Sequence, residues 1–217
     1  MLGLPKSTEI SKQLPKKVIY TKFQMNTSEK NKIDTDISRI SIMNEISPNR
    51  VNIPEGQEVK NFFVLLVNLK RKDFNEKTIA TLSKIIPQKI LFILEYGDEG
   101  KLAIFRTRLM QTGWKPTTSC TIELRGLNLD KVWENIVVDI GGVSITDSNT
   151  LDEQIAIDDR RQKIKKEIAK LENRTRAEKQ PKKKFELATQ VKKLKKQLSE
   201  LGVAPVRDVK EETPVAK

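Results

Sequence analysis

Two short apolar runs constrain the fold of this chain more than any other feature of its sequence. The first is VKNFFVLLVNLK at 59–70, and the second is KILFILEY at 89–96. Each run is nearly continuous and is bounded by charged residues, which is typical of strands that are buried on both faces of a sheet. The two runs therefore predict central strands with the hydrophobic core built around them.

The segment between the two runs has the pattern of an amphipathic helix. In DFNEKTIATLSKIIP, at 73–87, Asn75 is a candidate N-cap and Pro87 is a stop signal. Between them, Ile79 and Leu82 recur on one helical face. A helix between two buried strands is therefore expected.

Weaker signals predict further strands on either side. ISRISIMNEIS at 37–47 carries isoleucines at alternate positions, which favours a strand, although Ile33, Ile37 and Ile40 also fit a helix. GDEG at 97–100 predicts a turn, and KLAIFRTRL predicts the strand that returns from it. TGWKPTTSCTIEL at 112–124 is read as a loop followed by a strand.

Helix signals complete this part of the chain. Ser7 is expected to cap a short helix that Pro15 stops, and NTSEKNKIDTD at 26–36 predicts a polar helix start. Asn128 is expected to cap a helix that ends at Gly141. The order of elements predicts an α+β fold with a mixed or antiparallel sheet of about five strands and flanking helices. We assign residues 1–148 to this body.

Beyond the body the sequence changes to helical, strongly basic segments. Leu187, Val191, Leu194, Leu198 and Leu201 follow one another at spacings of four and three, which is a heptad seam. A poorer stripe precedes it, and Pro181 lies between the two. The pattern predicts a coiled-coil-like αα-hairpin over 149–202, or else one kinked helix that pairs with a second chain. Residues 203–217 are charged and poor in large apolar residues, which predicts a disordered tail.

The net charge of +12 is concentrated in these helices. Residues 160–196 hold 16 Lys and Arg against four Glu, so the rest of the chain sums to zero. Such an asymmetry suggests an anionic partner such as DNA or RNA, although a charged helix face can also serve only to keep the helix in water. The candidate phosphate-contacting residues are Lys182, Lys183, Lys184, Lys192, Lys193, Lys195 and Lys196.

Composition lowers the expectation of catalysis. The chain has no histidine, which removes the usual general base, His-based zinc sites and the Ser-His and Cys-His nucleophile systems. Cys120 is the single cysteine and cannot form an internal disulfide. There is no apolar run long enough to span a bilayer and no signal-peptide pattern at the start. We predict no cofactor, no metal site and no membrane association, and a cytoplasmic location.

One catalytic pattern is a specific alternative. Nucleases of the Asp…(Asp/Glu)-x-Lys type hold a divalent metal with two acids and place a lysine two residues after the second acid. Here Asn68 occupies the place of that second acid and Lys70 follows it. Glu45, Glu55 and Glu58 are candidates for the first acid. Because asparagine carries no charge to hold a metal, the pattern predicts a degenerate site, with Lys70 and Glu58 as the alternative catalytic residues.

Six stretches spread along nearly the whole chain resemble a bacterial and archaeal family of uncharacterised proteins. They are LGLPKSTEISKQLPKK, ISPNRVNIPEG, IIPQKILFILEYGDEGKLAIFRT, the GW at 113–114, LRGLNLDKVWENIV and EKQPKKKFELATQVKKLKKQL. The resemblance implies an occurrence beside helicase and methyltransferase genes of restriction or phage-defence type. It also implies an acid and a lysine at the end of the second strand, where this chain has Asn68 and Lys70.

The resemblance and the charge together favour a non-catalytic accessory protein. We expect the body to dock on a larger helicase-like or methyltransferase protein, and the basic hairpin to contact that protein or its nucleic acid. The divalent-metal nuclease is one alternative, and a structural homodimer joined through the coiled coil is another.

Overall fold

A computed structural model describes residues 2–143 and 150–201 of the chain. The chain divides into two compact units, Met1–Ser144 and Ile145–Lys217. The expected disordered tail at 203–217 lies outside the described residues.

The first unit is built on a mixed sheet. Its strands are β1 (Glu9–Gln13), β2 (Ile37–Ile46), β3 (Phe62–Leu69), β4 (Lys89–Tyr96), β5 (Glu99–Phe105), β6 (Leu109–Gln111) and β7 (Lys115–Pro116). Its α-helices are α1 (Lys16–Lys22), α2 (Thr27–Asp36), α3 (Pro48–Val51), α4 (Glu76–Ile85) and α5 (Leu129–Gly141). The described part of the second unit contains α6 (Leu151–Ala177) and α7 (Pro181–Glu200).

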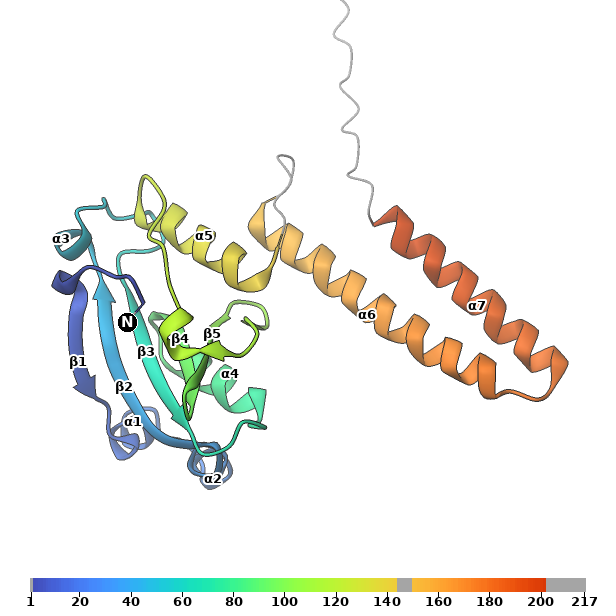
Figure 1. Ribbon diagram of the computed structural model, residues 1–217, viewed down its shortest axis with the longest axis horizontal. Coiled ribbons are helices and arrows are strands. Elements are labelled where there is room, and N and C mark those ends of the chain that lie inside the picture. The colour runs from blue at the N-terminus through green and yellow to red at the C-terminus, as the bar shows by residue number, and fades with distance from the viewer. Residues whose placement is uncertain (1, 144–149, 202–217) are drawn as a thin grey trace, which may run out of the picture. The chain divides into compact units, whose positions relative to one another are not determined.

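The sheet has seven strands, in the order β1-β2-β3-β4-β5-β6, with β7 paired to β5. Figure 1 shows β1 to β5 following one another across the sheet. Among the described strands, β3 and β4 alone form a parallel pair, with Leu65 opposite Phe92, and α4 connects them. All other neighbours are antiparallel. The predicted α+β class with a mixed sheet is confirmed, and the sheet is larger than the predicted five strands because β1, β6 and β7 are short edge strands.

Helices cover both faces of the sheet. On one face, residues of α1, α2 and α4, among them Ile19, Ile33 and Ile79, pack with Leu65 and Phe92 in a single buried cluster. On the other face, the ring of Trp133 in α5 lies 5.1 Å from the ring of Phe62 in β3, centroid to centroid. This burial on both faces is the reason that β3 and β4 read as continuous apolar runs.

Several local expectations were wrong. Pro15 does not stop a helix but is the N-cap of α1, where its missing N–H costs the helix no hydrogen bond. The residues before it form β1 instead of a helix. The strand expected around Cys120 is replaced by a 3-10 turn at Thr117–Ser119. The returning strand expected over 101–109 ends at Phe105, and β6 begins only at Leu109.

The helix ends are closer to expectation. The side chains of Asn75 and Asn128 accept hydrogen bonds from the backbone N–H groups of Lys77 and Lys131, as predicted for N-caps. The C-terminal stop of α5 is one residue later than expected. Gly142, not Gly141, has the left-handed φ of 59° that ends the helix.

A tight approach at Gly56 links the loop before β3 to α5. The Asp130 carboxylate accepts hydrogen bonds from the backbone N–H groups of Gln57 and Val59, and a Cβ on Gly56 would lie 2.1 Å from its Oδ1. We expect Gly56→Ala to displace Asp130 and lower the Tm by roughly 5 °C, measured by the fluorescence of the two tryptophans. Gly113→Ala, whose Cβ would meet no atom within 4 Å, is the control. An equal Tm for both variants would contradict this role of Gly56.

Candidate functional site

The seven lysines singled out from the sequence all lie exposed on α7. Two of them have acidic partners. Lys195 Nζ lies 2.8 Å from Glu172 Oε1 of α6, and Lys196 Nζ lies 3.9 Å from Glu200 Oε1. Within the described parts of the chain, no ion pair engages the other five, which are Lys182, Lys183, Lys184, Lys192 and Lys193. Their charges are therefore available to an anionic ligand.

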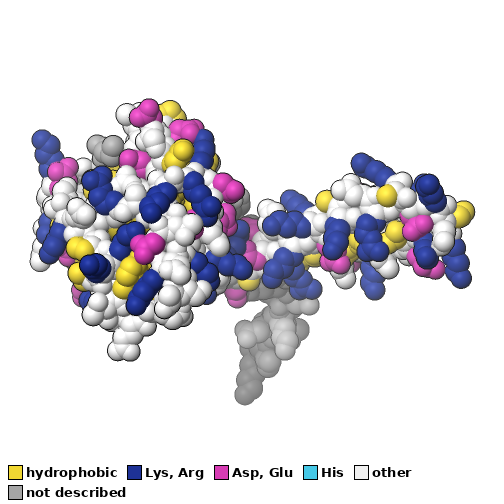
Figure 2. All heavy atoms as spheres, turned by 90° about the horizontal axis from the view of Figure 1, so that it is seen from below, with side chains coloured by type: hydrophobic (Ala, Val, Ile, Leu, Met, Phe, Trp, Pro, Cys, Tyr) yellow, Lys and Arg dark blue, Asp and Glu magenta, His cyan; other side chains and the backbone are white. Residues whose placement is uncertain are grey.

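The surface of the second unit is basic along both helices. Figure 2 shows Lys and Arg side chains spread over α6 and α7, with fewer acidic side chains between them. The side chain of Phe185 is 75% exposed and directly follows three lysines in sequence. A surface of this kind attracts phosphate groups without reading base sequence.

The residues of the heptad seam hold α7 against α6. Val191 is buried in one cluster with Ile164, Ile168 and Leu171 of α6. The remaining seam residues pack against this cluster while staying partly exposed; they are Leu187, Leu194, Leu198 and Leu201. Arg161, which interrupts the apolar stripe of α6, donates a hydrogen bond to the carbonyl oxygen of Leu201. A polar residue in the seam thus caps the C-terminal end of α7.

Val191→Asp tests how much this seam stabilises the α6–α7 unit. A carboxylate among apolar side chains loses its hydration without gaining a partner, so we expect the free energy of unfolding of this unit to fall by about 3 kcal/mol. Urea unfolding followed by far-UV circular dichroism measures the change. Gln190→Asp, an exposed neighbour with the same change in charge, is expected to leave the midpoint nearly unchanged. Equal losses in the two variants would mean that the seam adds little stability.

Asn68 and Lys70, from the nuclease-like pattern, lie at the carboxyl end of β3. The Asn68 amide bridges two neighbouring strands. Its Oδ1 accepts from Arg39 Nε at 3.1 Å and its Nδ2 donates to Glu95 Oε1 at 3.1 Å. Lys70 Nζ donates to the backbone carbonyl oxygen of Asp34 at 2.6 Å. Glu58 precedes the amino end of β3, so the whole strand separates it from Lys70.

Asp36, a residue that the sequence did not single out, is the buried acid nearest to this end of β3. It lies at the end of α2, and its side chain is 2% exposed. Its Oδ1 accepts from Arg71 Nη2 at 2.7 Å, and its Oδ2 accepts from Thr78 Oγ1 at 2.8 Å and from the Asn75 backbone N–H at 3.1 Å. Burial opposes ionisation, but these hydrogen bonds outweigh it and hold the pKa of Asp36 below its ordinary value.

Both carboxylate oxygens of Asp36 are thus occupied by protein donors, and the carboxylate joins α2 to the start of α4. Its neighbour Asp34 is similarly engaged by Lys16 and Tyr20. Among the residues that the structure describes, no group of three or more Cys, Asp or Glu side chains is placed to hold a metal ion.

Lys101 is a second buried charged residue that sequence reasoning missed. Its Nζ lies 4.8 Å from the ring centroids of both Phe74 and Trp114, and burial lowers the pKa of its amine. The sequence around Lys101 carries no sign of this environment, because the two aromatic rings come from distant loops. The two rings offer the buried ammonium group cation–π contacts, and the charge of Glu76 partly opposes the effect of burial on its pKa.

The structure places the chain in a class of proteins that combine an α+β unit with a pair of basic helices. The acidic side chains of the described residues form no metal site. No helix in the described ranges is long and apolar enough to cross a bilayer. The profile of one family, "Domain of unknown function (DUF4391)", matches residues 2–198. The chain belongs to this family. No curated protein and no solved structure matches it.

Proposed function

We propose that this protein is a non-catalytic accessory subunit of a cytoplasmic DNA-processing system of restriction or phage-defence type. In this proposal the sheet-containing unit docks on a larger helicase-like or methyltransferase protein. The α6–α7 pair forms a coiled-coil-like hairpin that contacts nucleic acid, or the partner, through its lysines. The resemblance of the sequence to a family encoded beside such enzymes supports the choice of partner.

The observation that carries the nucleic-acid role is the set of five exposed α7 lysines that form no ion pair among the described residues. Lysines that release counterions from phosphate make binding steeply dependent on salt. We therefore expect the full chain to bind duplex DNA or RNA of arbitrary sequence, and to lose roughly five hundredfold in affinity between 50 and 200 mM salt if the five lysines make the phosphate contacts. Fluorescence anisotropy with labelled duplexes at both salt concentrations measures it. An affinity that does not change with salt would contradict the proposed contact.

The docking role is tested by affinity purification of the tagged full chain from its native host. Recovery of a helicase-like or methyltransferase protein in a fixed ratio is the expected result. A homodimer with no further component, identified by light scattering of the purified chain, would favour a purely structural role instead.

The absence of catalysis is tested separately. Incubation of DNA with the protein and Mg²⁺ or Mn²⁺ is expected to produce no cleavage, because Asn68 is held between Arg39 and Glu95 and Lys70 contacts a backbone carbonyl. Metal-dependent cleavage that is lost in Lys70→Ala would overturn the accessory role and establish the nuclease alternative.

A further inference from the structure

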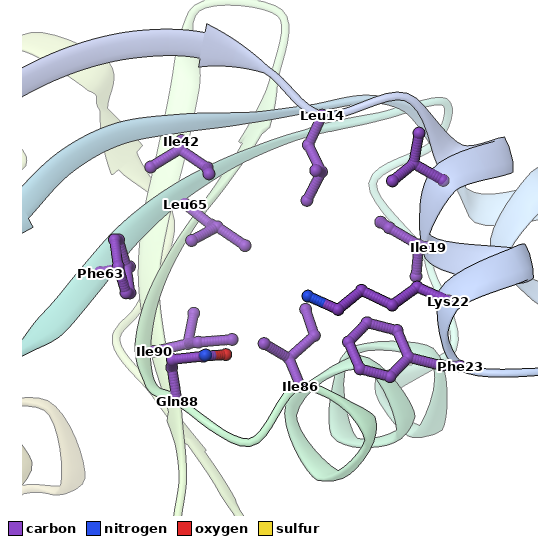
Figure 3. A pocket seen from close by; sticks show the side chains of 11 residues that line it. Leu14, Ile19, Lys22, Phe23, Ile42, Phe63, Leu65, Ile86, Gln88 and Ile90 are labelled. Atoms are coloured by element: carbon purple, nitrogen blue, oxygen red, sulfur yellow. The ribbon is translucent and has the colours of Figure 1, made fainter.

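A pocket of about 230 Å³ opens between α1 and strands β2, β3 and β4. Figure 3 shows its side chains arranged around an open centre. Its apolar walls include Leu14, Ile42, Phe63, Leu65, Ile86 and Ile90. An apolar cavity of about 150 Å³ is large enough to hold benzene, so this pocket has room for a short alkyl chain or a substituted ring.

One cation reaches into this apolar space. The Nζ of Lys22 points toward the centre of the pocket, and the side-chain amide of Gln88 lies at the wall beside Ile90 (Figure 3). No described residue forms an ion pair with Lys22, whose amine lies 5.7 Å from the Phe23 ring centroid. Apolar walls with a few convergent polar groups are the usual composition of a small-molecule site.

We propose that this pocket binds a small aliphatic carboxylate, such as a medium-chain fatty acid. The alkyl chain fills the space among the apolar side chains. The carboxylate pairs with Lys22 Nζ and accepts a hydrogen bond from the amide nitrogen of Gln88. Charge-assisted hydrogen bonds of this kind are stronger than neutral ones, and they orient the ligand with its acid group toward the opening.

The surroundings of the pocket favour a small molecule over the surface of a partner protein. Stable protein interfaces bury more than about 1,000 Å² around an apolar centre. Of the pocket-lining residues, Val18 is the one large apolar side chain that is exposed, at 50%. Its exposed neighbours on α1 are Lys17, Thr21 and Lys22. Val18 is thus surrounded on the exposed side of α1 by lysine and threonine side chains.

Calorimetric titration of the full chain with octanoate and with 1-octanol tests this assignment. We expect octanoate to bind with one site per chain, and Lys22→Met to weaken it by about tenfold while leaving 1-octanol unchanged. Lys17→Met, which removes the same charge from the same helix outside the pocket, is the matched control and is expected to bind octanoate as the wild type does.

A second variant tests the cavity itself. Ile42→Trp places a larger side chain in the pocket and is expected to abolish binding of both ligands, with circular dichroism confirming that the sheet is retained. Equal octanoate affinity in wild type and Lys22→Met would overturn the proposal. So would the lack of saturable octanoate binding at millimolar concentration, which would instead assign the pocket to an apolar side chain of a partner protein.

Discussion

Replacing the five lysines of α7 that form no ion pair with a described residue by glutamine is expected to weaken the binding of duplex DNA by a hundredfold or more at low salt. The substituted residues are Lys182, Lys183, Lys184, Lys192 and Lys193. Each phosphate contact contributes about 0.9 to the slope of log affinity against log salt concentration, so the magnitude of the slope should fall by about 4.5 if all five touch phosphate. Glutamine has nearly the helix propensity of lysine, so α7 itself should persist.

A matched control distinguishes the effect of the α7 lysines from the effect of net charge alone. In this control, glutamine replaces five exposed lysines of the first unit that form no ion pair among the described residues. The net charge falls by the same amount. The replaced residues are Lys6, Lys12, Lys17, Lys32 and Lys77. We expect this variant to keep most of the affinity and of the salt slope. If both variants lose affinity equally, only the overall charge matters and α7 is not the site.

The central part of the fold could be read from local sequence because its signals are local. A strand buried on both faces is apolar along most of its length, and β3 and β4 are apolar except at Asn68 in β3 and at Lys89 and Glu95 in β4. The N-caps Asn75 and Asn128 act on backbone groups two and three residues away, so their short-range pattern is enough to identify them. The heptad spacing from Leu187 to Leu201 likewise reports contacts that repeat along one helix face.

The edges of the sheet could not be predicted in the same way. β1 has mostly exposed residues and pairs only with β2, so its five residues lack an apolar pattern. β7 has two residues, and its pairing with β5 depends on a loop that brings Pro116 opposite Glu99. Such strands are defined by tertiary pairing rather than by their own side chains.

The candidate sites also differ in whether the sequence signal for them is local. The α7 lysines were visible as a concentration of charge, whereas the role of Asp36 depends on Arg71, Asn75 and Thr78, which are 35 to 42 residues away. The environment of Lys22 is hidden for the same reason, because the pocket walls come from four separate elements. A polar helix that ends in an acid just before an apolar strand, as at Asp36, is the one local signal that was available.

Asp36→Asn is expected to destabilise the first unit by about 3 kcal/mol at pH 7. The side chain is 2% exposed, and breaking a buried charge pair on one side leaves donors without a partner. The loss of stability should lie at the lower end of the range known for broken buried ion pairs, because the Arg71 side chain is 53% exposed and can turn toward water. Trp114 and Trp133 both belong to this unit, so their fluorescence during urea unfolding reports its stability.

The pH dependence of this stability loss tests whether the charge of the Asp36 carboxylate is its cause. Because folding lowers the pKa of Asp36, its contribution to stability is fully present above the unfolded value near 4 and is lost as the pH falls through the lower folded value. The difference between wild type and Asp36→Asn should therefore shrink as the pH falls below about 4. Asp34→Asn, at a side chain that is 50% exposed, should cost much less at pH 7. If the stability difference between wild type and Asp36→Asn stayed the same down to pH 2, the site would require the shape of the aspartate side chain rather than its charge.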